Sequence, residues 1–258
     1  MVFDIIGCIW VEHHEKVLLI NFYAYSNFFE NLNLNKCIRL VSNKVLKRFF
    51  TSLKVKKQIQ KGRFHSIFKF LNIKFIEGWE SRLGNYEIVE KHADIIRNIF
   101  CFNKQITNPI DEIFSSLEDT IIIGIHIRRG DYKTWREGIY FYSDENYVSL
   151  MNQLKQQLSI ITDRNIKFLL CSNEHINLLN FAKLDCFIIP ETSGEKDLYA
   201  LSKCSYIIGP PSTYSQWASF MGKVPMKFVM FPSEKIKLSD LSVVLSLDRF
   251  DNNKEFSF

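Results

Sequence analysis

The second half of the chain repeats one pattern, in which a short apolar run is followed by a polar segment of helical length. The apolar runs, all between residues 120 and 231, are TIIIGIHIR, IKFLLCSN, CFIIPE, SYIIG and MKFVMF. The segments between them are SDENYVSLMNQLKQQL, EHINLLNFAKL, EKDLYALSKC and STYSQWASFMG. Strands that are apolar throughout and alternate with helices are typical of a parallel sheet covered on both faces. We therefore predict an α/β fold with ligands at the carboxyl ends of the strands.

The first part of the chain is less regular, and we interpret it as a separate, smaller α/β domain. KVLLIN reads as a strand, and the apolar residues of EIVEKHADIIRNIF recur at helical spacing. Asn108-Pro109 then interrupts the pattern, as such pairs do at the ends of elements. We therefore predict an N-terminal domain of residues 1–112 and a C-terminal domain of residues 113–258.

No segment indicates a membrane span, because no apolar run approaches the roughly 20 residues that cross a bilayer. The first residues, MVFDIIGCIWVEHHE, lack the basic start of a signal peptide. The six cysteines are scattered singly, and neither they nor the six histidines have the spacing of metal ligands. We expect a cytoplasmic protein with reduced, buried thiols and no metal.

The net charge of +5 conceals an uneven distribution. Residues 31–76 contain 12 Lys and Arg residues and no Asp or Glu, so the rest of the chain is acidic on balance. Such a block is usually a solvated face, and the alternative is a surface that contacts anionic lipid. Nucleic acid is the weaker interpretation, because no motif of a nucleic-acid reader accompanies the charge. We expect no nucleic-acid partner.

The strand TIIIGIHIR ends in ionisable residues. His126 and Arg128 share one face of this strand because residues two apart point the same way, and Gly124 leaves room on that face. Arg129 and Asp131 follow where the strand gives way to a loop. Two arginines at the ligand-binding edge suggest a phosphate or diphosphate clamp. An Arg–Asp ion pair that closes the loop explains the same residues, and these residues alone leave both readings open.

A second candidate site follows the strand SYIIG. Pro210 and Pro211 stop that strand, and a helix restarts at Ser212 or Thr213, whose free backbone N–H groups would suit an anion. The alternative is that Ser212 is a simple N-cap. Asp197 lies early in another helix, where it is either a partner of the helix dipole or a carboxylate that accepts from the N1 and N2 donors of guanine.

At these residues the sequence resembles a known family. HIRRGD matches the HxRRxD signature of the α-1,2-, α-1,6- and nodulation fucosyltransferases, and DLYALSKCSYIIGPPSTYSQWASFMG resembles the second block of the bacterial α-1,2-fucosyltransferases, glycosyltransferase family 11. GWESR and EIVEKHADIIRNIF resemble the region upstream, so the resemblance covers roughly residues 16 to 230. It implies a GT-B-like architecture with a Rossmann-like C-terminal domain that holds GDP-fucose. It also implies inverting transfer of fucose to a sugar hydroxyl, without a metal or other cofactor.

The resemblance also implies roles for individual residues. Arg128 would bind the β-phosphate of GDP, His126 and Asp197 would hold the nucleoside, and Ser212 with Thr213 would contact the diphosphate. The implied donor-binding residues are therefore His126, Arg128, Arg129, Asp197, Ser212 and Thr213.

Inverting transfer also requires a base for the acceptor hydroxyl. Asp131 is the first candidate for this base, and Asp144 and Glu145 are the second choices. Arg128 and Asp131 are therefore the implied catalytic residues. The alternative for Asp131 is a structural ion pair with Arg129.

The sequence departs from the family in two places. The family opens with a strand and a loop of the form GGLGNQLFQ, which this chain lacks, so we expect the N-terminal acceptor-side domain to be without them. Gln216-Trp217 stands where the family often has Trp-Trp. The expected acceptor is a galactose-containing bacterial glycan, free or lipid-linked. Fucose would be joined to it in α-1,2 linkage during surface polysaccharide synthesis. The alternatives are a glycosyltransferase with another nucleotide-sugar donor and a non-catalytic nucleotide-binding protein.

Overall fold

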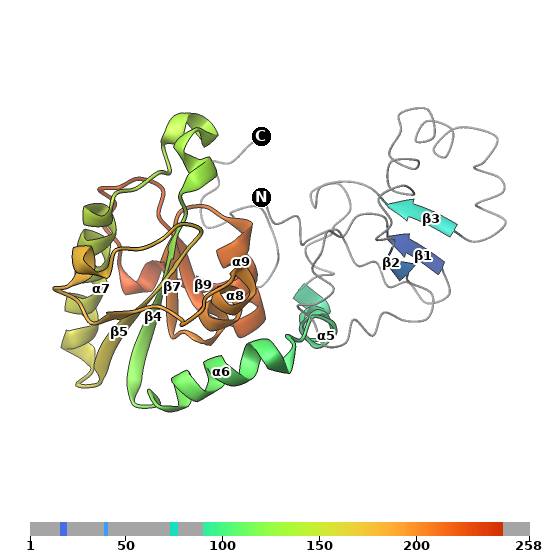
Figure 1. Cartoon of the computed structure of the whole chain (residues 1–258), viewed down its shortest axis with the longest axis horizontal. Helices are drawn as coiled ribbons and strands as arrows, with labels where there is room; N and C mark the ends of the chain where they lie inside the picture. Colours follow the sequence, from blue (N-terminus) through green and yellow to red (C-terminus); the bar gives the residue numbers. More distant parts are fainter. Residues whose placement is uncertain (1–15, 20–38, 41–72, 77–89, 245–258) are drawn as a thin grey trace. The chain divides into compact units, whose positions relative to one another are not determined.

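The structure is a computed structural model that describes residues 16–19, 39–40, 73–76 and 90–244 (Figure 1). The chain divides into two compact units, Met1–Asn103 and Lys104–Phe258. The boundary expected after residue 112 differs from this division and falls inside helix α6 (Lys104–Ser115).

Helix α6 continues through Pro109, although the Asn108-Pro109 pair was expected to interrupt the chain. Two tertiary contacts explain why the helix persists. The next residue, Ile110, is fully buried. Asp111 accepts a hydrogen bond of 2.8 Å from the Tyr199 hydroxyl and pairs with Lys203 at 3.0 Å. These contacts offset the hydrogen bond that the proline cannot donate.

The described part of the first unit contains a small parallel sheet and one helix. The strands β1 (Lys16–Leu19), β2 (Arg39–Leu40) and β3 (Ile73–Ile76) lie in the order β2-β1-β3. This confirms the strand predicted at KVLLIN. The helix expected from EIVEKHADIIRNIF is described in part, as α5 (Ala93–Ile99), and its first residues lie outside the described ones. Most of the basic block of residues 31–76 lies outside the described residues.

The second unit is built on a six-stranded sheet with the order β6-β5-β4-β7-β8-β9. Its strands are β4 (Thr120–Ile127), β5 (Asn165–Ser172), β6 (Cys186–Phe187), β7 (Tyr206–Gly209), β8 (Pro225–Phe228) and β9 (Ser242–Val243). All neighbours are parallel except β8 and β9. This confirms the predicted α/β class with a Rossmann-like parallel sheet. The two units each contain a parallel sheet, as a GT-B-like architecture requires.

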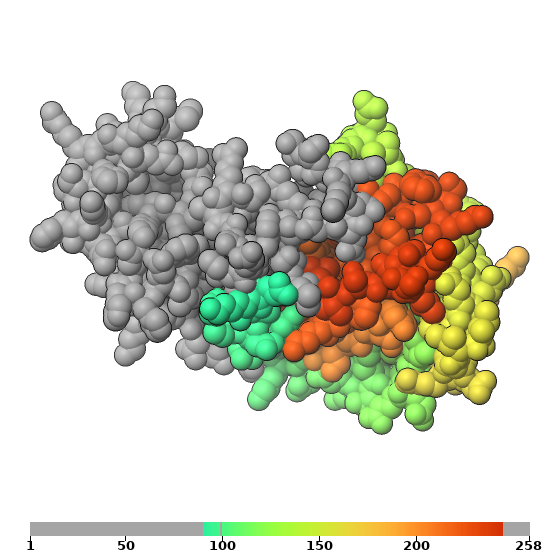
Figure 2. Space-filling view, turned by 180° about the vertical axis from the view of Figure 1, so that it is seen from behind, coloured from blue at the N-terminus to red at the C-terminus, as the bar shows by residue number. Residues whose placement is uncertain are grey.

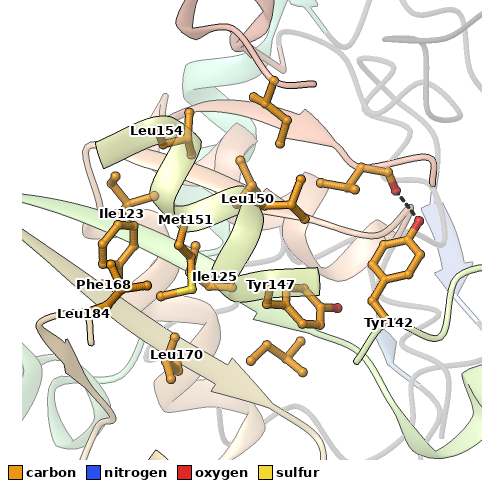
Figure 3. Packing of buried hydrophobic residues seen from close by; sticks show 14 of the residues in the cluster. Ile123, Ile125, Tyr142, Tyr147, Leu150, Met151, Leu154, Phe168, Leu170 and Leu184 are labelled. Carbon is orange, nitrogen blue, oxygen red and sulfur yellow. Dashed lines mark hydrogen bonds between the residues drawn. The ribbon is translucent and has the colours of Figure 1, made fainter. Parts of the chain in front are cut away.

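Helix α7 (Asp144–Ile161) covers one face of this sheet (Figure 3). Ile123 and Ile125 of β4 pack in one cluster with Phe168 and Leu170 of β5. The helix contributes its buried stripe to the same cluster, namely Tyr147, Leu150, Met151, Leu154 and Leu158. The spacing of this stripe is that of an amphipathic helix. Ser143 is the predicted N-cap and accepts a hydrogen bond from the backbone N–H of Asn146.

Helices α8 (Gly194–Lys203) and α9 (Thr213–Gly222) pack side by side on the opposite face, with α6 against α8. Seen from behind, α8, α9 and the segment that follows them form the orange-to-red surface of this unit (Figure 2). Gly124 faces this layer, and a Cβ there would lie 2.6 Å from Leu201 Cδ2. The space beside Gly124 is therefore filled by α8. The close packing of this helix, and not a ligand, explains why a glycine is needed there.

Two predicted elements are shorter than expected. EHINLLNFAKL forms only a short turn of 3-10 helix, η5 (Leu178–Phe181), and CFIIPE pairs with β5 only at Cys186–Phe187. The helix fails because its apolar residues do not share a buried face: Phe181 is buried, whereas Leu179 is 80% exposed. The other short 3-10 elements among the described residues are η3 (Gly130–Lys133), η4 (Trp135–Gly138) and η6 (Leu238–Asp240).

No helix in the described part of the chain is long and apolar enough to cross a membrane. Of the four cysteines described, Cys171 and Cys204 are buried, as expected, and Cys186 is half-buried. Cys101 is exposed, which corrects the expectation that the thiols are all buried.

Candidate active site

The strand order reverses at β4, because the chain runs outward from β4 to β6 on one side and returns to β7 on the other. In open parallel sheets this switch point is where a crevice forms at the carboxyl ends of the strands. Here those ends carry the HIRRGD and GPPST segments. Ile125 pairs with Ile208, so His126 lies beside Gly209. A Cβ on Gly209 would lie 2.6 Å from the His126 carbonyl oxygen and 2.8 Å from its Cβ. Glycine is needed there for the two strands to meet.

His126 is almost fully buried at this junction, with its ring centroid 5.1 Å from that of Tyr214. Burial, followed by repulsion from Arg128, lowers the pKa of His126 to about 3. The imidazole is therefore neutral at physiological pH. Its Nδ1 atom is buried and has no hydrogen-bond partner among the described residues. A buried polar atom of this kind is uncommon and suits a group that binds a ligand.

Arg128 points to the same side as His126, and its side chain is 9% exposed. Its Nη2 atom lies 3.0 Å from Oδ1 and 3.1 Å from Oδ2 of Asp131. Its guanidinium carbon lies 5.5 Å from the centre of the Tyr132 ring. Asp131 thus pairs with Arg128, which corrects the alternative that it pairs with Arg129. The Arg128 Nε atom is buried and has no hydrogen-bond partner in the part of the chain that the structure describes.

Arg129 lies on the other face of the strand, where its guanidinium pairs with Asp144 at the start of α7. Asn180 also donates to Asp144, at 2.6 Å. Asn173 holds the backbone of Arg129 with hydrogen bonds of 2.8 and 3.1 Å. Asp144, named above as a second candidate base, therefore neutralises Arg129. Glu145 is exposed, and its hydrogen bond with the Ser143 side chain lowers its pKa.

Asp197 occupies the first turn of α8 and is buried, with 5% exposure. The Thr192 hydroxyl donates to its carboxylate. Burial raises the pKa of Asp197 to about 6, and hydrogen bonds from Thr192, Cys171 and the Ser172 backbone oppose the rise. The carboxylate is ionised above that pH and retains the capacity to accept further hydrogen bonds.

Ser212 and Thr213 lie at the start of α9, as predicted. Ser212 is the N-cap and accepts from the backbone N–H of Tyr214 at 3.3 Å, so the alternative of a simple cap is observed. This cap is compatible with an anion site, since the first N–H groups of a helix have no partner within the helix. The Tyr132 hydroxyl donates to the carbonyl of Pro211, directly before this cap.

Tyr132 and Tyr214 are the site residues that sequence reasoning missed. Tyr132 connects Arg128 to the start of α9. Tyr214 packs on His126 and donates to the Gly194 carbonyl in α8. Their positions beside Asp131 and Thr213 in the sequence were the available signal, but tyrosines at strand and helix ends have no specific chemical meaning by themselves.

The structure brings together His126, Arg128 and Asp131 with the start of α9, and it places Arg129 on the other face. No group of three or more His, Cys, Asp or Glu side chains in the described part of the chain could hold a metal ion. One guanidinium, one helix N-terminus, a neutral imidazole and a buried carboxylate together suit a ligand that is anionic at one end and rich in hydrogen-bond donors at the other.

The chain is similar in sequence to a bacterial glycosyltransferase. It is 24% identical over 159 residues to the O-antigen biosynthesis glycosyltransferase WbnK of Escherichia coli, covering 56% of this chain and 50% of WbnK. The chain thus spans about half the length of this relative.

Similar solved structures are a NodZ α-1,6-fucosyltransferase co-crystallised with GDP and POFUT1 in complex with GDP-fucose. The NodZ match has 17% identity and a TM-score of 0.47, and covers 78% of this chain and 76% of that chain. A second NodZ structure, from Bradyrhizobium, has 16% identity and a TM-score of 0.47, with 78% and 77% covered. The POFUT1 match has 10% identity and a TM-score of 0.46, with 84% and 74% covered.

The model of the family described as glycosyl transferase family 11 matches residues 79–229. This range is more than half of the chain. It contains β4, α8 and α9, and with them the residues of the switch point described above. The chain therefore belongs to glycosyl transferase family 11.

Proposed function

We propose that the protein is an inverting fucosyltransferase that moves fucose from GDP-fucose to a hydroxyl of a galactose-containing glycan, in α-1,2 linkage. One observation carries the proposal: Arg128 and the start of α9 lie together at the switch point, joined through Tyr132. A fixed cation and a helix N-terminus at one edge suit a diphosphate. Membership of family 11 supports the glycosyltransferase class.

In this proposal the second unit binds the donor. Arg128 contacts the β-phosphate, and Ser212 and Thr213 contact the diphosphate with backbone and hydroxyl groups. Asp197 accepts from the N1 and N2 donors of guanine, and His126 bonds to the nucleoside through a neutral ring nitrogen. Uracil lacks the paired donors of guanine, so the buried Asp197 carboxylate favours a guanine nucleotide over UDP.

The transfer step uses the charge of Arg128 and the carboxylate of Asp131. The acceptor oxygen attacks C1 of fucose while its proton passes to Asp131, and the bond from C1 to the β-phosphate oxygen breaks. The electron pair of that bond leaves with GDP, where Arg128 stabilises it without a metal ion. Asp131 is partly exposed, so a hydroxyl can approach it; diphosphate oxygens compete with it for Arg128.

The proposal also includes the acceptor and the location of the reaction. The relative WbnK is named for O-antigen biosynthesis, which supports a bacterial surface polysaccharide as the acceptor. A lipid-linked acceptor would place the protein at the cytoplasmic face of the inner membrane. The basic block of residues 31–76 would then lie against anionic lipid.

The direct test is GDP release from GDP-fucose with and without lactose, in parallel with UDP- and ADP-sugars and with EDTA. We expect release that requires both GDP-fucose and lactose and that EDTA leaves unchanged. Preference for another nucleotide would establish a different donor. GDP binding with no turnover on any acceptor would establish a non-catalytic nucleotide-binding protein.

Two variants separate the roles in the same assay. Arg128→Ala should weaken GDP binding about 10- to 100-fold, because a hydrogen bond between charged groups is lost. Asp131→Asn should keep GDP binding and lower turnover about 100-fold, because the base is lost. If Asp131→Asn instead unfolds the protein, the pairing of Asp131 with Arg128 is structural and the base lies elsewhere.

A further inference from the structure

Tyr132 is built into the switch point by both ends of its side chain. Tyr132 lies two residues after Gly130, whose φ of +62° is left-handed. The turn at Gly130 directs the chain from β4 back across the strand ends. The residue is 7% exposed, and its ring lies beneath the Arg128 guanidinium at 5.5 Å. The ring therefore supports the cation through a cation–π contact in a largely desolvated place.

The other end of Tyr132 reaches the second candidate site. Its hydroxyl donates to the Pro211 carbonyl, directly before Ser212, the N-cap of α9. Burial raises the pKa of Tyr132 to about 12, so the hydroxyl keeps its proton throughout the physiological range. A buried hydroxyl that remains a donor fixes the backbone just before the N-cap of α9.

We propose that Tyr132 is a positioning residue that sets the distance between Arg128 and the N-terminus of α9, so that both grip one diphosphate. The inference deepens the function proposed above and rests on it. Arg128 directly follows β4 and Ser212 lies beyond the end of β7, so the two groups come from different strand ends. Tyr132 contacts Arg128 with its ring and Pro211, the residue before Ser212, with its hydroxyl. A change in Tyr132 should therefore disturb recognition of the two phosphates together more than recognition of either one.

The first variant is Tyr132→Phe, which keeps the ring under Arg128 and removes the bond to Pro211. We expect the affinity for GDP to fall about three- to tenfold, while the affinity for GMP changes less, because GMP lacks the β-phosphate that Arg128 would bind. Tyr132→Leu removes the ring as well and should lower GDP affinity about 30-fold or more. With GDP-fucose, KM for the donor should rise and KM for the acceptor should stay constant.

Tyr142→Phe is the matched control. Tyr142 is also buried, and its hydroxyl donates to the Val229 carbonyl at 2.7 Å, at the end of β8 (Figure 3). The Tyr142→Phe variant loses the same kind of hydrogen bond as Tyr132→Phe, from a tyrosine hydroxyl to a backbone carbonyl. Both variants should therefore lower the melting temperature similarly. Only Tyr132→Phe should change the ratio of GDP to GMP affinity.

The outcomes separate this inference from the function on which it rests. If the unmodified protein does not bind GDP in calorimetry, the proposed function fails. If it binds GDP and Tyr132→Phe keeps the GDP to GMP ratio within twofold, the donor site stands and the positioning role is overturned. The role is also overturned if Tyr142→Phe changes the ratio equally. Melting curves of each variant show that the measured protein is folded.

Discussion

Consecutive residues at the end of β4 have different environments because a strand directs alternate side chains to opposite faces. His126 packs on Tyr214 of α9, whereas Arg129 pairs with Asp144 at the start of α7. The two adjacent arginines are therefore not equivalent. Arg128 is held by a partly exposed carboxylate that a ligand can displace, and Arg129 is held by Asp144 and Asn173.

Asp197 gives a pH prediction at the scale of one residue. Its pKa is raised from 3.8 to about 6 in the folded protein, so the folded state binds this proton more tightly than the unfolded state. The free energy of unfolding therefore falls as pH rises from about 4 to 6, and ionised Asp197 lowers stability at pH 7 by up to roughly 3 kcal/mol. Asp197→Asn should remove that slope in denaturant titrations and raise stability at pH 7.

GDP affinity should change in the opposite direction. Only the ionised carboxylate accepts two hydrogen bonds from guanine, so affinity should rise through pH 6 and level off, and Asp197→Asn should bind weakly at every pH. Asp163→Asn, an exposed carboxylate at the far end of the sheet, is the control and should match the parent protein. A GDP affinity independent of pH between 5 and 8 would remove Asp197 from guanine recognition.

At the scale of elements, the site depends on how closely β4 and β7 approach. Gly209 lies against His126 with no space for a side chain. The neighbouring helices are held by bonds between elements: Tyr214 of α9 reaches α8 at Gly194, and Tyr199 of α8 reaches α6 at Asp111. A shift at one strand end should therefore displace the helices of the layer formed by α6, α8 and α9.

Gly209→Ala tests this approach. The added Cβ would lie 2.6 Å from a backbone oxygen, which cannot rotate away, so β4 and β7 must separate. We expect a loss of about 1–3 kcal/mol in the free energy of unfolding, with weaker GDP binding. Ser143→Ala, which removes the N-cap of α7 on the other face, should cost about 1 kcal/mol and leave GDP affinity unchanged. Equal GDP affinity in both variants would show that the strand spacing does not set the donor site.

At the scale of the whole molecule, the charge distribution separates two parts of the chain. The net charge is +5, and 12 of the 33 basic residues lie in the acid-free block of residues 31–76. The block belongs to the first unit, while the candidate site belongs to the second. In the proposed function the first unit contacts the membrane and the second unit binds the donor.

Vesicle co-sedimentation tests the basic block. Each basic residue near an anionic surface contributes about 1 kcal/mol, and salt screens the attraction. We expect binding to vesicles with anionic lipid at low ionic strength, release at high ionic strength, and no binding to neutral vesicles. A variant with Lys54, Lys56 and Lys57 changed to Gln should bind less and keep its GDP affinity. Equal recovery in the supernatant under all conditions would leave the block as a solvated face.

The sequence alone determined the order of most elements in the second unit and indicated which residues form its candidate site. Apolar runs such as TIIIGIHIR specify buried parallel strands, and Ser143 and Ser212 are caps whose chemistry is local. Local interactions of this kind act within a few residues, so they can be read from the chain directly. The same holds for the shared face of His126 and Arg128, which follows from the geometry of a strand.

Only the tertiary structure decided which charged groups meet. Asp131 pairs with Arg128 and Asp144 with Arg129 because the turn at Gly130 and the start of α7 bring them there. Pro109 remains inside α6 because of contacts with α8, and EHINLLNFAKL loses its helix because Leu178 and Leu179 remain exposed. Tyr132 joins two elements 79 residues apart in the sequence. Such contacts depend on the three-dimensional packing of distant segments, which residue spacing does not encode.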